Sequence, residues 1–345
     1  MKTRQPAQAP SGPALSAQIV ALYQQTVATS LRQSPLVATT PAAFAAWQRQ
    51  ARARLRRILG ELPTVRPDLA VARQVVEEHP DYTRERLVYT TRPGLQATAY
   101  LLTPRRLTGR VPAVLCLHGH GVGGKDEAID PASIYRGFGR RFAAAGLVAL
   151  CPDQIGFGER ALPDGKVNYQ VLVHGLNMLG QTLIGWRYWD LVRALDLLQS
   201  LPTVQADRIG VMGLSLGGEM TLFLSGLQAR VRAACVCGYL TSHRSTFLDR
   251  PHCTCGHLRD LARHFEHVDL AALIAPRPLF LDAGRQDESF PVAEARRLVR
   301  QLRPVYQLHD CPASWLGLEV HDGGHEIAGT RSIPWMIDRL RDEGH

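Results

Sequence analysis

The sequence contains no long uninterrupted apolar run. Charged residues break every apolar stretch before it reaches the roughly 20 residues of a membrane-spanning helix, and the mean hydropathy is −0.11. Residues 1–20 also lack the continuous apolar core of a secretory signal peptide. We therefore expect neither a transmembrane helix nor a secretory signal. With 45% hydrophobic and 21% charged residues, the 345-residue chain suits one large α/β domain or two smaller ones, and a disordered chain is excluded.

Acidic residues are missing from residues 1–60, which contain eight lysines and arginines. The rest of the chain holds the other 32 of the 40 basic residues against all 31 acidic ones, so the net charge of +9 divides into +8 and +1. A strongly basic chain often binds nucleic acid. Because the excess lies in one N-terminal segment, we expect no nucleic-acid partner and assign the function to the near-neutral remainder.

The seven cysteines are an odd number and do not form the even set of a disulfide framework. Four of them lie inside apolar runs: Cys116, Cys151, Cys235 and Cys237. Free cysteine is among the residues most often buried, and reduced thiols are typical of the cytoplasm. We therefore predict a cytoplasmic protein with buried, reduced cysteines.

Two amphipathic helices are expected near the N-terminus, at residues 14–31 and 41–59, after a flexible tail at 1–13. Thr40 followed by Pro41 is a good start for the second helix. Its apolar residues form one stripe, from which most arginines are absent: Phe44, Trp47, Ala51, Leu55 and Ile58. Such a stripe predicts that the helix docks on the rest of the protein. Residues 1–60 are therefore expected to be a tail and helical arm.

Residues 61–345 have the pattern of one α/β catalytic domain without internal repeats. Three strands are expected between residues 71 and 103. Apolar strands then alternate with helices: the strands are 113–117, 147–151, 209–212, 233–237, 279–282 and 316–320, and the helices are 132–145, 178–200, 217–228, 292–302 and 333–341. This alternation predicts a mostly parallel sheet with helices on both faces.

The strongest chemical motif is Gly213-x-Ser215-x-Gly217, between a predicted strand and a predicted helix. In that context the serine sits on a sharp turn that exposes its hydroxyl above the sheet. The flanking glycines are needed because the strand and helix backbones approach too closely for a Cβ atom. The N–H groups that begin the helix are directed at negative charge on the serine. Ser215 is therefore the candidate nucleophile.

A serine nucleophile needs a base and an acid that orients it, and in this architecture the acid precedes the histidine in the chain. Asp287 lies in the loop after the strand at 279–282, whereas its rival Asp282 belongs to the strand itself; Glu288 is a further rival. His325 follows two glycines after the last strand, and we prefer it to His321, which ends that strand. The predicted triad is Ser215, Asp287 and His325.

An acyl-transfer site also needs hydrogen-bond donors for the oxyanion. The N–H of Leu216, directly after the serine, is the first predicted donor. The second should come from the loop after an early strand, and the strand at 113–117 is followed by His118-Gly-His-Gly121. Because the glycines permit a tight backbone there, the N–H of His120 is the second predicted donor.

These motifs resemble the α/β-hydrolase superfamily, and within it the dienelactone-hydrolase-like and acetyl-xylan-esterase-like bacterial esterases. The matching segments cover residues 110–340 in the family's order: Leu117-His-Gly-His-Gly121, Cys151-Pro-Asp-Gln-Ile-Gly-Phe-Gly158, Gly185-Trp-Arg-Tyr-Trp-Asp190, Gly213-Leu-Ser-Leu-Gly-Gly218, His252-Cys-Thr-Cys255, Ile274-Ala-Pro-Arg-Pro278 and Gly323-Gly-His325. The resemblance implies a serine carboxylester hydrolase with the same three residues as its triad. It does not name the ester.

The segment at about 239–268 is expected to be a lid or pocket-wall insertion. It contains His252-Cys-Thr-Cys255, with His243, His264 and His267 nearby, but not the two separated ligand pairs of a structural zinc site. We therefore favour a structural loop over a metal site, and over a Cys253–Cys255 disulfide.

Four charged residues are interpreted as structural. Glu219 suits the dipole of the helix after Ser215, and we prefer a helix-terminus acid paired with an arginine to a residue that tunes His325. Arg187 and Asp190 have the spacing of a helical ion pair. Asp153, which follows a buried strand, is expected to anchor its loop.

The sequence thus predicts an esterase that acts on small or short-chain carboxylic esters through an acyl-enzyme, without a metal or organic cofactor. An amidase or peptidase of the same fold is one alternative. The other is a non-catalytic binding protein on a hydrolase scaffold with a basic arm, although all three triad candidates are present. A homo-oligomer is compatible with the sequence.

Overall fold

The computed structural model of the chain describes residues 12–31, 36, 38–162, 169–249 and 252–342. Most of the tail predicted at 1–13 lies outside these residues. No helix within them combines the length and the apolar character needed to cross a membrane.

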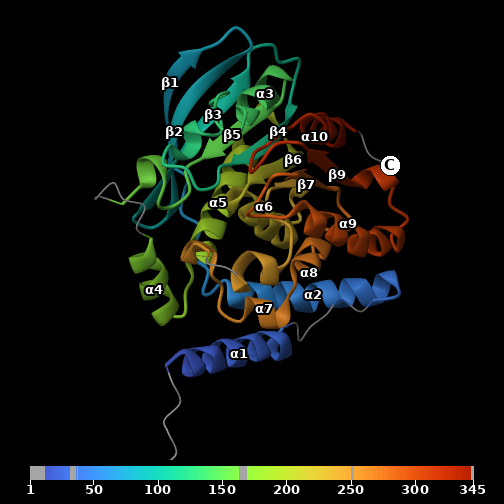
Figure 1. Cartoon of the computed structure of the whole chain (residues 1–345). Coiled ribbons are helices and arrows are strands. Elements are labelled where there is room, and N and C mark those ends of the chain that lie inside the picture. The colour runs from blue at the N-terminus through green and yellow to red at the C-terminus, as the bar shows by residue number, and fades with distance from the viewer. Residues whose placement is uncertain (1–11, 32–35, 37, 163–168, 250–251, 343–345) are drawn as a thin grey trace, which may run out of the picture.

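A nine-stranded sheet forms the centre of the described fold (Figure 1). Its spatial order is β1-β2-β3-β5-β4-β6-β7-β8-β9. The strands are β1 Ala72–Glu78, β2 Tyr82–Arg92, β3 Leu95–Pro104, β4 Val111–Leu117, β5 Val148–Pro152, β6 Val204–Leu214, β7 Val231–Cys237, β8 Leu279–Gly284 and β9 Leu316–His321. The strands β1, β2 and β3 are antiparallel to their neighbours, and the six strands from β4 to β9 run parallel to one another. The predicted mostly parallel α/β fold is therefore confirmed.

Helices cover both faces of the sheet. On one face lie α3 Phe138–Ala144 and α10 Ser332–Arg341; on the other lie α5 Leu183–Ser200, α6 Leu216–Leu227, α8 His267–Ala272 and α9 Val292–Gln307. Strand residues alternate between the two cores. In β4, for example, Val114 and Cys116 belong to the core of α3 and α10, whereas Leu115 belongs to the other core. Both faces are buried because parallel strands need cover on both sides.

The second N-terminal helix, α2 Pro41–Ile58, docks on the body as its apolar stripe predicts. Phe44, Ala51 and Leu55 are buried against the larger core. Polar contacts add to this docking, since the Gln48 amide donates to the carbonyl oxygen of Ala275 at 2.7 Å. The N-cap at Thr40 is also present, because its hydroxyl accepts from Ala43 N at 3.2 Å.

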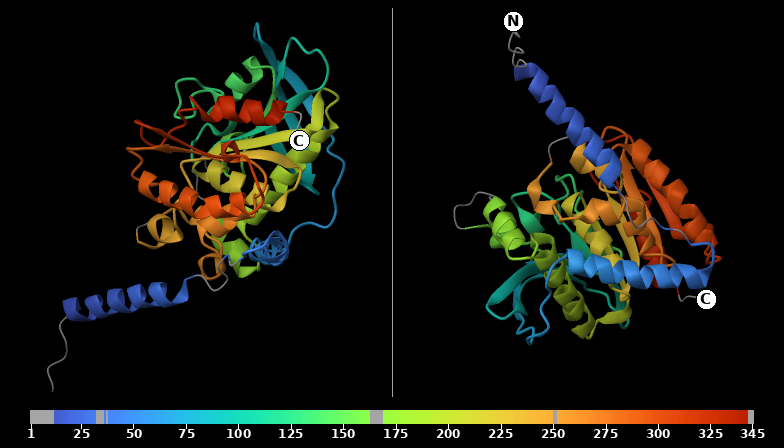
Figure 2. Two further views of the ribbon diagram at one scale, coloured as in Figure 1. Left: turned by 90° about the vertical axis from the view of Figure 1, so that its right-hand side faces the viewer. Right: turned by 90° about the horizontal axis from the view of Figure 1, so that it is seen from below.

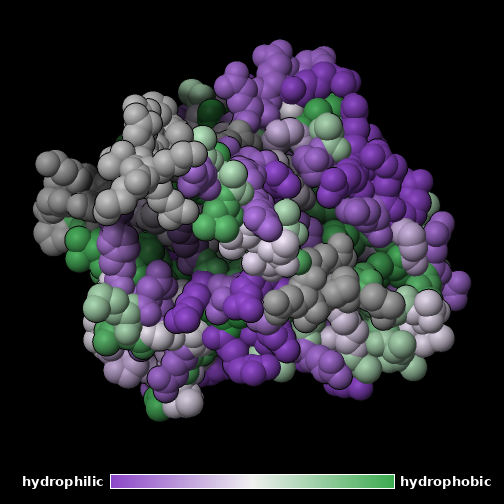
Figure 3. Space-filling view, turned by 60° about the horizontal axis from the view of Figure 1, so that its bottom comes forward, coloured by the Kyte–Doolittle hydropathy of each residue, from purple (hydrophilic) through white to green (hydrophobic). Residues whose placement is uncertain are grey.

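The first helix, α1 Gly12–Ser30, extends beside the body rather than packing along it (Figures 1 and 2). Ile19, Leu22 and Tyr23 are exposed, and Val27 is buried. Its apolar residues therefore do not form a docked stripe like that of α2. In Figure 3 the end of the molecule that carries α1 and α2 is turned toward the viewer. This face is mainly hydrophilic, with smaller apolar areas among the hydrophilic ones.

Two predicted helices are shorter than their sequence pattern. The helix expected at 178–200 begins only at Leu183, as α5, because Gly180 has a positive φ of 70° and Thr182 caps α5 by accepting from Gly185 N. A separate helix that was not predicted, α4 Gln170–Met178, precedes it. The helix expected at 132–145 begins only at Phe138, since Arg136 and Gly137 both have positive φ. In both places a left-handed residue, rather than hydrophobic periodicity, determines where the helix begins.

Candidate active site

Ser215 lies on a sharp turn between β6 and α6. Its dihedral angles are φ 60° and ψ −122°, a conformation that serine rarely adopts. The turn is held from both sides, because the N–H of Ser215 donates to the carbonyl oxygen of Cys237 at 3.0 Å and its own carbonyl accepts from Glu219 N at 2.9 Å. A Cβ atom at Gly217 would collide with the carbonyl oxygen of Leu117. The predicted strand–turn–helix is therefore present, with its glycines required by close packing.

Asp287 and His325 form a hydrogen-bonded pair above the ends of β8 and β9. The distance from His325 Nδ1 to Asp287 Oδ2 is 2.7 Å. The other carboxylate oxygen of Asp287 accepts from the backbone N–H groups of Ser289 and Phe290, both at 2.9 Å. Asp287 is buried, and the imidazole stacks on the Phe290 ring with 5.3 Å between ring centroids. The carboxylate is thus fixed by the backbone, and the imidazole is fixed by the carboxylate.

The rival residues Asp282 and His321 lie together in a different environment. Asp282 belongs to β8, as predicted, and its Oδ2 accepts from the Ser332 hydroxyl at 2.7 Å and from Gly329 N at 3.1 Å. Its Oδ1 lies 3.4 Å from Nε2 of His321, the last residue of β9. Burial raises the pKa of Asp282. These contacts tie Asp282 to the start of α10 and make it part of the packing.

Ser215 and the Asp287–His325 pair meet at one edge of the sheet. They follow β6, β8 and β9, whose carboxyl ends point to the same edge because the strands are parallel. Gly238, directly after β7, lies close to the imidazole, since a Cβ atom on it would be 3.0 Å from Cε1 of His325. Among the described residues, no hydrogen bond joins the Ser215 hydroxyl to His325. Another predicted rival, Glu288, is exposed beside Asp287.

The loop after β4 lies directly against Ser215. A Cβ atom on Gly119 would be 2.8 Å from the Cβ atom of Ser215. The N–H of Gly119 donates to the Tyr135 hydroxyl at 2.6 Å, a contact for which the sequence contained no signal. Burial lowers the pKa of His118 to about 4, and its Nε2 accepts from Gln154 N at 3.0 Å. His118 is thus a neutral residue that holds the loop, while the side chain of His120 is exposed.

Known proteins match this chain over most of its length. The model of the Abhydrolase family matches residues 33–312. YtaP of Bacillus subtilis (strain 168), assigned as a hydrolase, is 33% identical over 265 residues, which are 74% of this chain and 86% of YtaP. The chain belongs to the Abhydrolase family. The resemblance to α/β-hydrolases expected from the sequence is therefore confirmed.

Solved structures share the fold of this Abhydrolase-family chain at low sequence identity. A protein from Bacteroides fragilis NCTC 9343 assigned as an acetyl xylan esterase has a TM-score of 0.77 at 19% identity, covering 92% of this chain and 94% of its own. A glucuronoyl esterase from Solibacter usitatus has a TM-score of 0.68 at 17% identity, and the match covers 90% of this chain and 99% of the esterase. The common architecture thus spans almost the whole length of each protein.

A buried ion pair holds the loop after β4 in this family member. Lys125 is 1% exposed, and its Nζ lies 2.9 Å from Asp153 Oδ2 and 2.6 Å from Glu159 Oε1. Asp153 also accepts from Lys125 N at 2.7 Å and from the Thr98 hydroxyl at 2.6 Å. Asp153 therefore anchors its loop, as predicted. The sequence had not indicated its partner, one of only three lysines in the chain.

Replacing Lys125 with methionine is expected to lower the free energy of unfolding by about 3–5 kcal/mol, because it leaves the buried Asp153 carboxylate unpaired. Urea unfolding followed by circular dichroism measures this change. Arg285→Met is the control, since its ion pair with Asp322 is exposed and is expected to contribute at most about 1 kcal/mol. Equal stability of the two variants would contradict the anchoring role of Lys125.

Glu219 lies buried in the first turn of α6, behind the serine turn. It is not in an ion pair among the described residues, contrary to the prediction; instead the Tyr239 hydroxyl donates to its Oε1 at 3.0 Å. Burial raises the pKa of Glu219 to about 8, although the Tyr239 hydroxyl and the charge of Arg187 act in the opposite direction. Glu219 is therefore mainly protonated at neutral pH, which removes the need for a cationic partner.

The raised pKa predicts a pH-dependent stability. Between pH 4.5 and about 8 the unfolded chain releases the Glu219 proton, whereas the native protein keeps it. The free energy of unfolding therefore falls by up to about 1.4 kcal/mol for each pH unit in this range. Glu219→Gln removes this loss. The Tm of that variant should rise relative to the parent protein from pH 5 to pH 8. Glu294→Gln, in the first turn of α9, is the control; a pH-independent difference for Glu219→Gln would contradict the buried proton.

The predicted ion pair between Arg187 and Asp190 is wrong. Asp190 pairs with Arg160, with 2.7 Å between Oδ2 and Nη1. Arg187 instead donates to the carbonyl oxygen of Ile155 at 2.9 Å and lies over the ring of Phe157. Both partners come from the segment after β5, which tertiary packing brings onto α5. The i,i+3 spacing could not reveal these competing contacts.

The segment at 239–268 runs close to α6 as short helical turns. It comprises a π-helix at Arg244–Leu248, a 3₁₀-helix at Thr254–Gly256 and α7 Leu261–His264. His243 and His267 are buried with their rings 4.4 Å apart, and burial lowers the pKa of both. His264 lies at the surface, beside Arg54 of α2. These three histidines are therefore packing residues.

Proposed function

We propose that this Abhydrolase-family chain is a serine hydrolase that cleaves carboxylic esters through an acyl-enzyme. The observation that carries the proposal is the 2.7 Å contact between His325 Nδ1 and Asp287 Oδ2, at the sheet edge where Ser215 occupies its strained turn. A serine nucleophile together with a base that a carboxylate orients is the arrangement that acyl transfer requires. In this proposal Ser215 is the nucleophile, His325 the general base and Asp287 the residue that orients it.

The reaction begins when Ser215 Oγ attacks the ester carbonyl carbon and its proton passes to Nε2 of His325. Asp287 keeps the other ring proton on Nδ1 and stabilises the imidazolium. His325 then gives the proton to the leaving alcohol, and the carbon–oxygen bond of the ester breaks. A water molecule, deprotonated by His325, attacks the acyl-enzyme and releases the acid and the Ser215 hydroxyl.

The oxyanion is held in this proposal by the N–H groups of Leu216 and His120. Leu216 begins α6, so its N–H is among those that a helix leaves free. The β4 loop places its backbone beside the serine, as the close approach of Gly119 indicates. Neither donor requires a side chain; His120 has a glycine on each side, and Leu216 is followed by Gly217.

Small or short-chain esters are the proposed substrates. The structural neighbours include a protein assigned as an acetyl xylan esterase and a glucuronoyl esterase, and these names support this class. We propose that residues 61–345 form the catalytic domain, with 239–268 as a pocket wall and the arm at 1–60 as an accessory. The seven free cysteines favour a cytoplasmic location.

A fluorophosphonate probe followed by peptide mass spectrometry tests the proposal. The native protein should be labelled at Ser215, and prior incubation with p-nitrophenyl acetate should slow the labelling. The protein should also hydrolyse this ester faster than p-nitroacetanilide. Equal rates would favour an amidase, and a protein that neither labels nor hydrolyses any ester would favour the non-catalytic scaffold.

Substrate class is tested with the same preparation. Acetylated xylan oligosaccharides, methyl glucuronate esters and p-nitrophenyl esters of increasing acyl length are compared by kcat/KM. The proposal predicts the highest value for a short acyl chain. A preference for long acyl chains would overturn the assignment to short-chain esters.

A further inference from the structure

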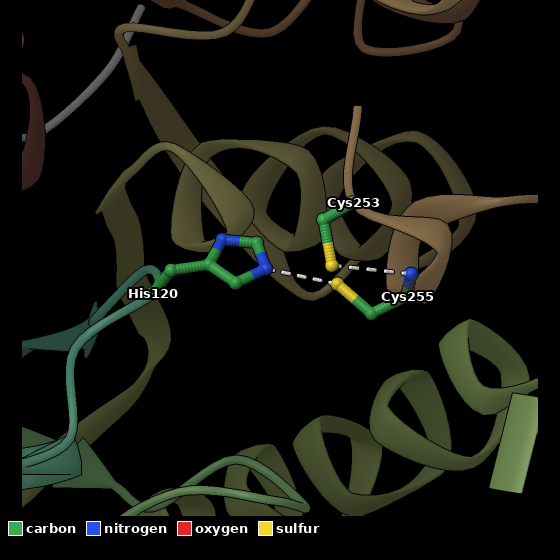
Figure 4. A group of neighbouring side chains, drawn as sticks. All are labelled: His120, Cys253 and Cys255. Carbon is green, nitrogen blue, oxygen red and sulfur yellow. Dashed lines mark hydrogen bonds between the residues drawn. The ribbon is translucent and has the colours of Figure 1, made fainter. Parts of the chain in front are cut away.

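Three side chains capable of binding a metal converge beside the β4 loop (Figure 4). They are His120, Cys253 and Cys255, whose ligand atoms all lie within 4.8 Å of one another. His120 Nε2 and Cys255 Sγ lie 2.9 Å apart. Cys255 is buried, Cys253 is half-buried and His120 is exposed. The group therefore reaches from the interior to the surface.

The three residues come from two segments that are distant in sequence. His120 follows β4, whereas both cysteines belong to the 3₁₀ turn within 239–268, and 135 positions separate His120 from Cys255. The turn fixes the Cys253 sulfur, because Cys255 N donates to Cys253 Sγ at 3.4 Å. Figure 4 shows both sulfurs facing the imidazole. This convergence depends on tertiary structure alone.

We propose that His120, Cys253 and Cys255 bind a zinc ion. Tetrahedral zinc with Zn–S bonds of about 2.3 Å and a Zn–N bond of about 2.0 Å places its ligand atoms about 3.5–3.8 Å apart, within the observed spread. Two thiolates balance the charge of Zn²⁺ and a neutral imidazole adds none, so the half-buried site carries no net charge. Soft sulfur ligands with an imidazole favour zinc over magnesium or calcium.

The site supplies three protein ligands, and water takes the fourth position. Tyr169 borders the group, since its hydroxyl is hydrogen-bonded to Cys253 and its ring lies edge-on to that of His120. These contacts come from the chain segment just before α4. The zinc would therefore sit where the β4 loop, the 239–268 segment and the start of α4 meet.

Such a zinc ion would cross-link the 239–268 segment to the β4 loop. The N–H of His120 is also a proposed oxyanion donor. The ion would therefore fix the position of this donor relative to the 239–268 segment, the proposed pocket wall. That consequence rests on the proposed function, whereas binding of zinc does not. Metal content therefore tests the site even if the proposed activity fails.

Metal analysis of the full chain, expressed in zinc-supplemented medium without a histidine tag and then dialysed, tests the proposal. Inductively coupled plasma mass spectrometry should find about one zinc ion per native chain. Cys253→Ser, Cys255→Ser and His120→Gln should each lose most of it, while Cys311→Ser, a half-buried thiol outside the group, should retain it. Circular dichroism of each variant establishes that loss of zinc does not reflect unfolding.

Cobalt substitution gives a second, independent measurement. The Co²⁺ protein should show thiolate-to-cobalt charge-transfer absorption and the visible bands of a tetrahedral site, both of which should be lost in Cys253→Ser. The proposal is overturned if native protein dialysed against zinc holds no more metal than Cys253→Ser. It is also overturned if the intact mass shows that Cys253 and Cys255 are joined in a disulfide.

Discussion

Replacing Ser215 with alanine is expected to lower kcat for p-nitrophenyl acetate by about 10⁶-fold, the scale found when a catalytic serine is removed from a triad. The variant keeps the oxyanion donors and the Asp287–His325 pair, but it has no atom that can form the acyl-enzyme. Its KM and its Tm should change little, because alanine removes a single half-buried hydroxyl oxygen. Steady-state kinetics and thermal unfolding measure the two effects separately.

Ser225→Ala is the matched control for this loss. Ser225 lies ten positions further along, in the helix α6 that follows Ser215, and its buried hydroxyl has no hydrogen-bond partner among the described residues. Its kcat should stay within about threefold of the native value. If Ser215→Ala kept more than a tenth of native turnover, a serine acyl-enzyme at this position would be ruled out.

Asp287→Asn is expected to lower kcat by about 10⁴-fold while leaving the fold intact. The asparagine amide can donate to Nδ1 of His325, which favours the imidazole tautomer with its proton on Nε2. That tautomer cannot accept the proton of Ser215. Because the backbone N–H groups of Ser289 and Phe290 still meet a carbonyl oxygen, the loop should keep its shape.

Asp282→Asn distinguishes the two Asp–His pairs of the structure. Asp282 faces Ser332, Gly329 and His321, so its replacement should change the Tm more than it changes kcat. The kinetic comparison is made with p-nitrophenyl acetate across pH 6 to 9. A 10⁴-fold loss in Asp282→Asn together with an active Asp287→Asn would transfer the orienting role to Asp282.

Much of the candidate site follows from local sequence. Ser215, Asp287 and His325 each come directly after an apolar strand, and parallel strands place their carboxyl ends at one edge. The glycines around Ser215 are required by contacts within the motif and with the adjacent strand, so their spacing alone predicted the turn. The apolar stripe of α2 likewise predicted docking, because the periodicity of a helix determines which side chains share a face.

Other features depended on partners that are remote in sequence. Asp190 pairs with Arg160 rather than with Arg187, Glu219 is bonded to Tyr239 rather than to an arginine, and Lys125 is buried on Asp153. The sequence had suggested a different partner for Asp190 and for Glu219, and none for Lys125. The observed partners come from the packing of the segments after β4, β5 and β7.

The sequence by itself determined the order of the strands along the chain, the serine turn and the positions of the acid and base loops, because these depend on periodicity and on steric limits within a few residues. The sequence preferred Asp287 to Asp282 because Asp287 follows the strand, and only the tertiary structure shows what contacts each acid: His325 contacts Asp287, and Ser332 contacts Asp282. It alone placed His120 beside Cys253 and Cys255. A side chain's distant neighbours depend on how whole elements pack, and no local pattern contains that information.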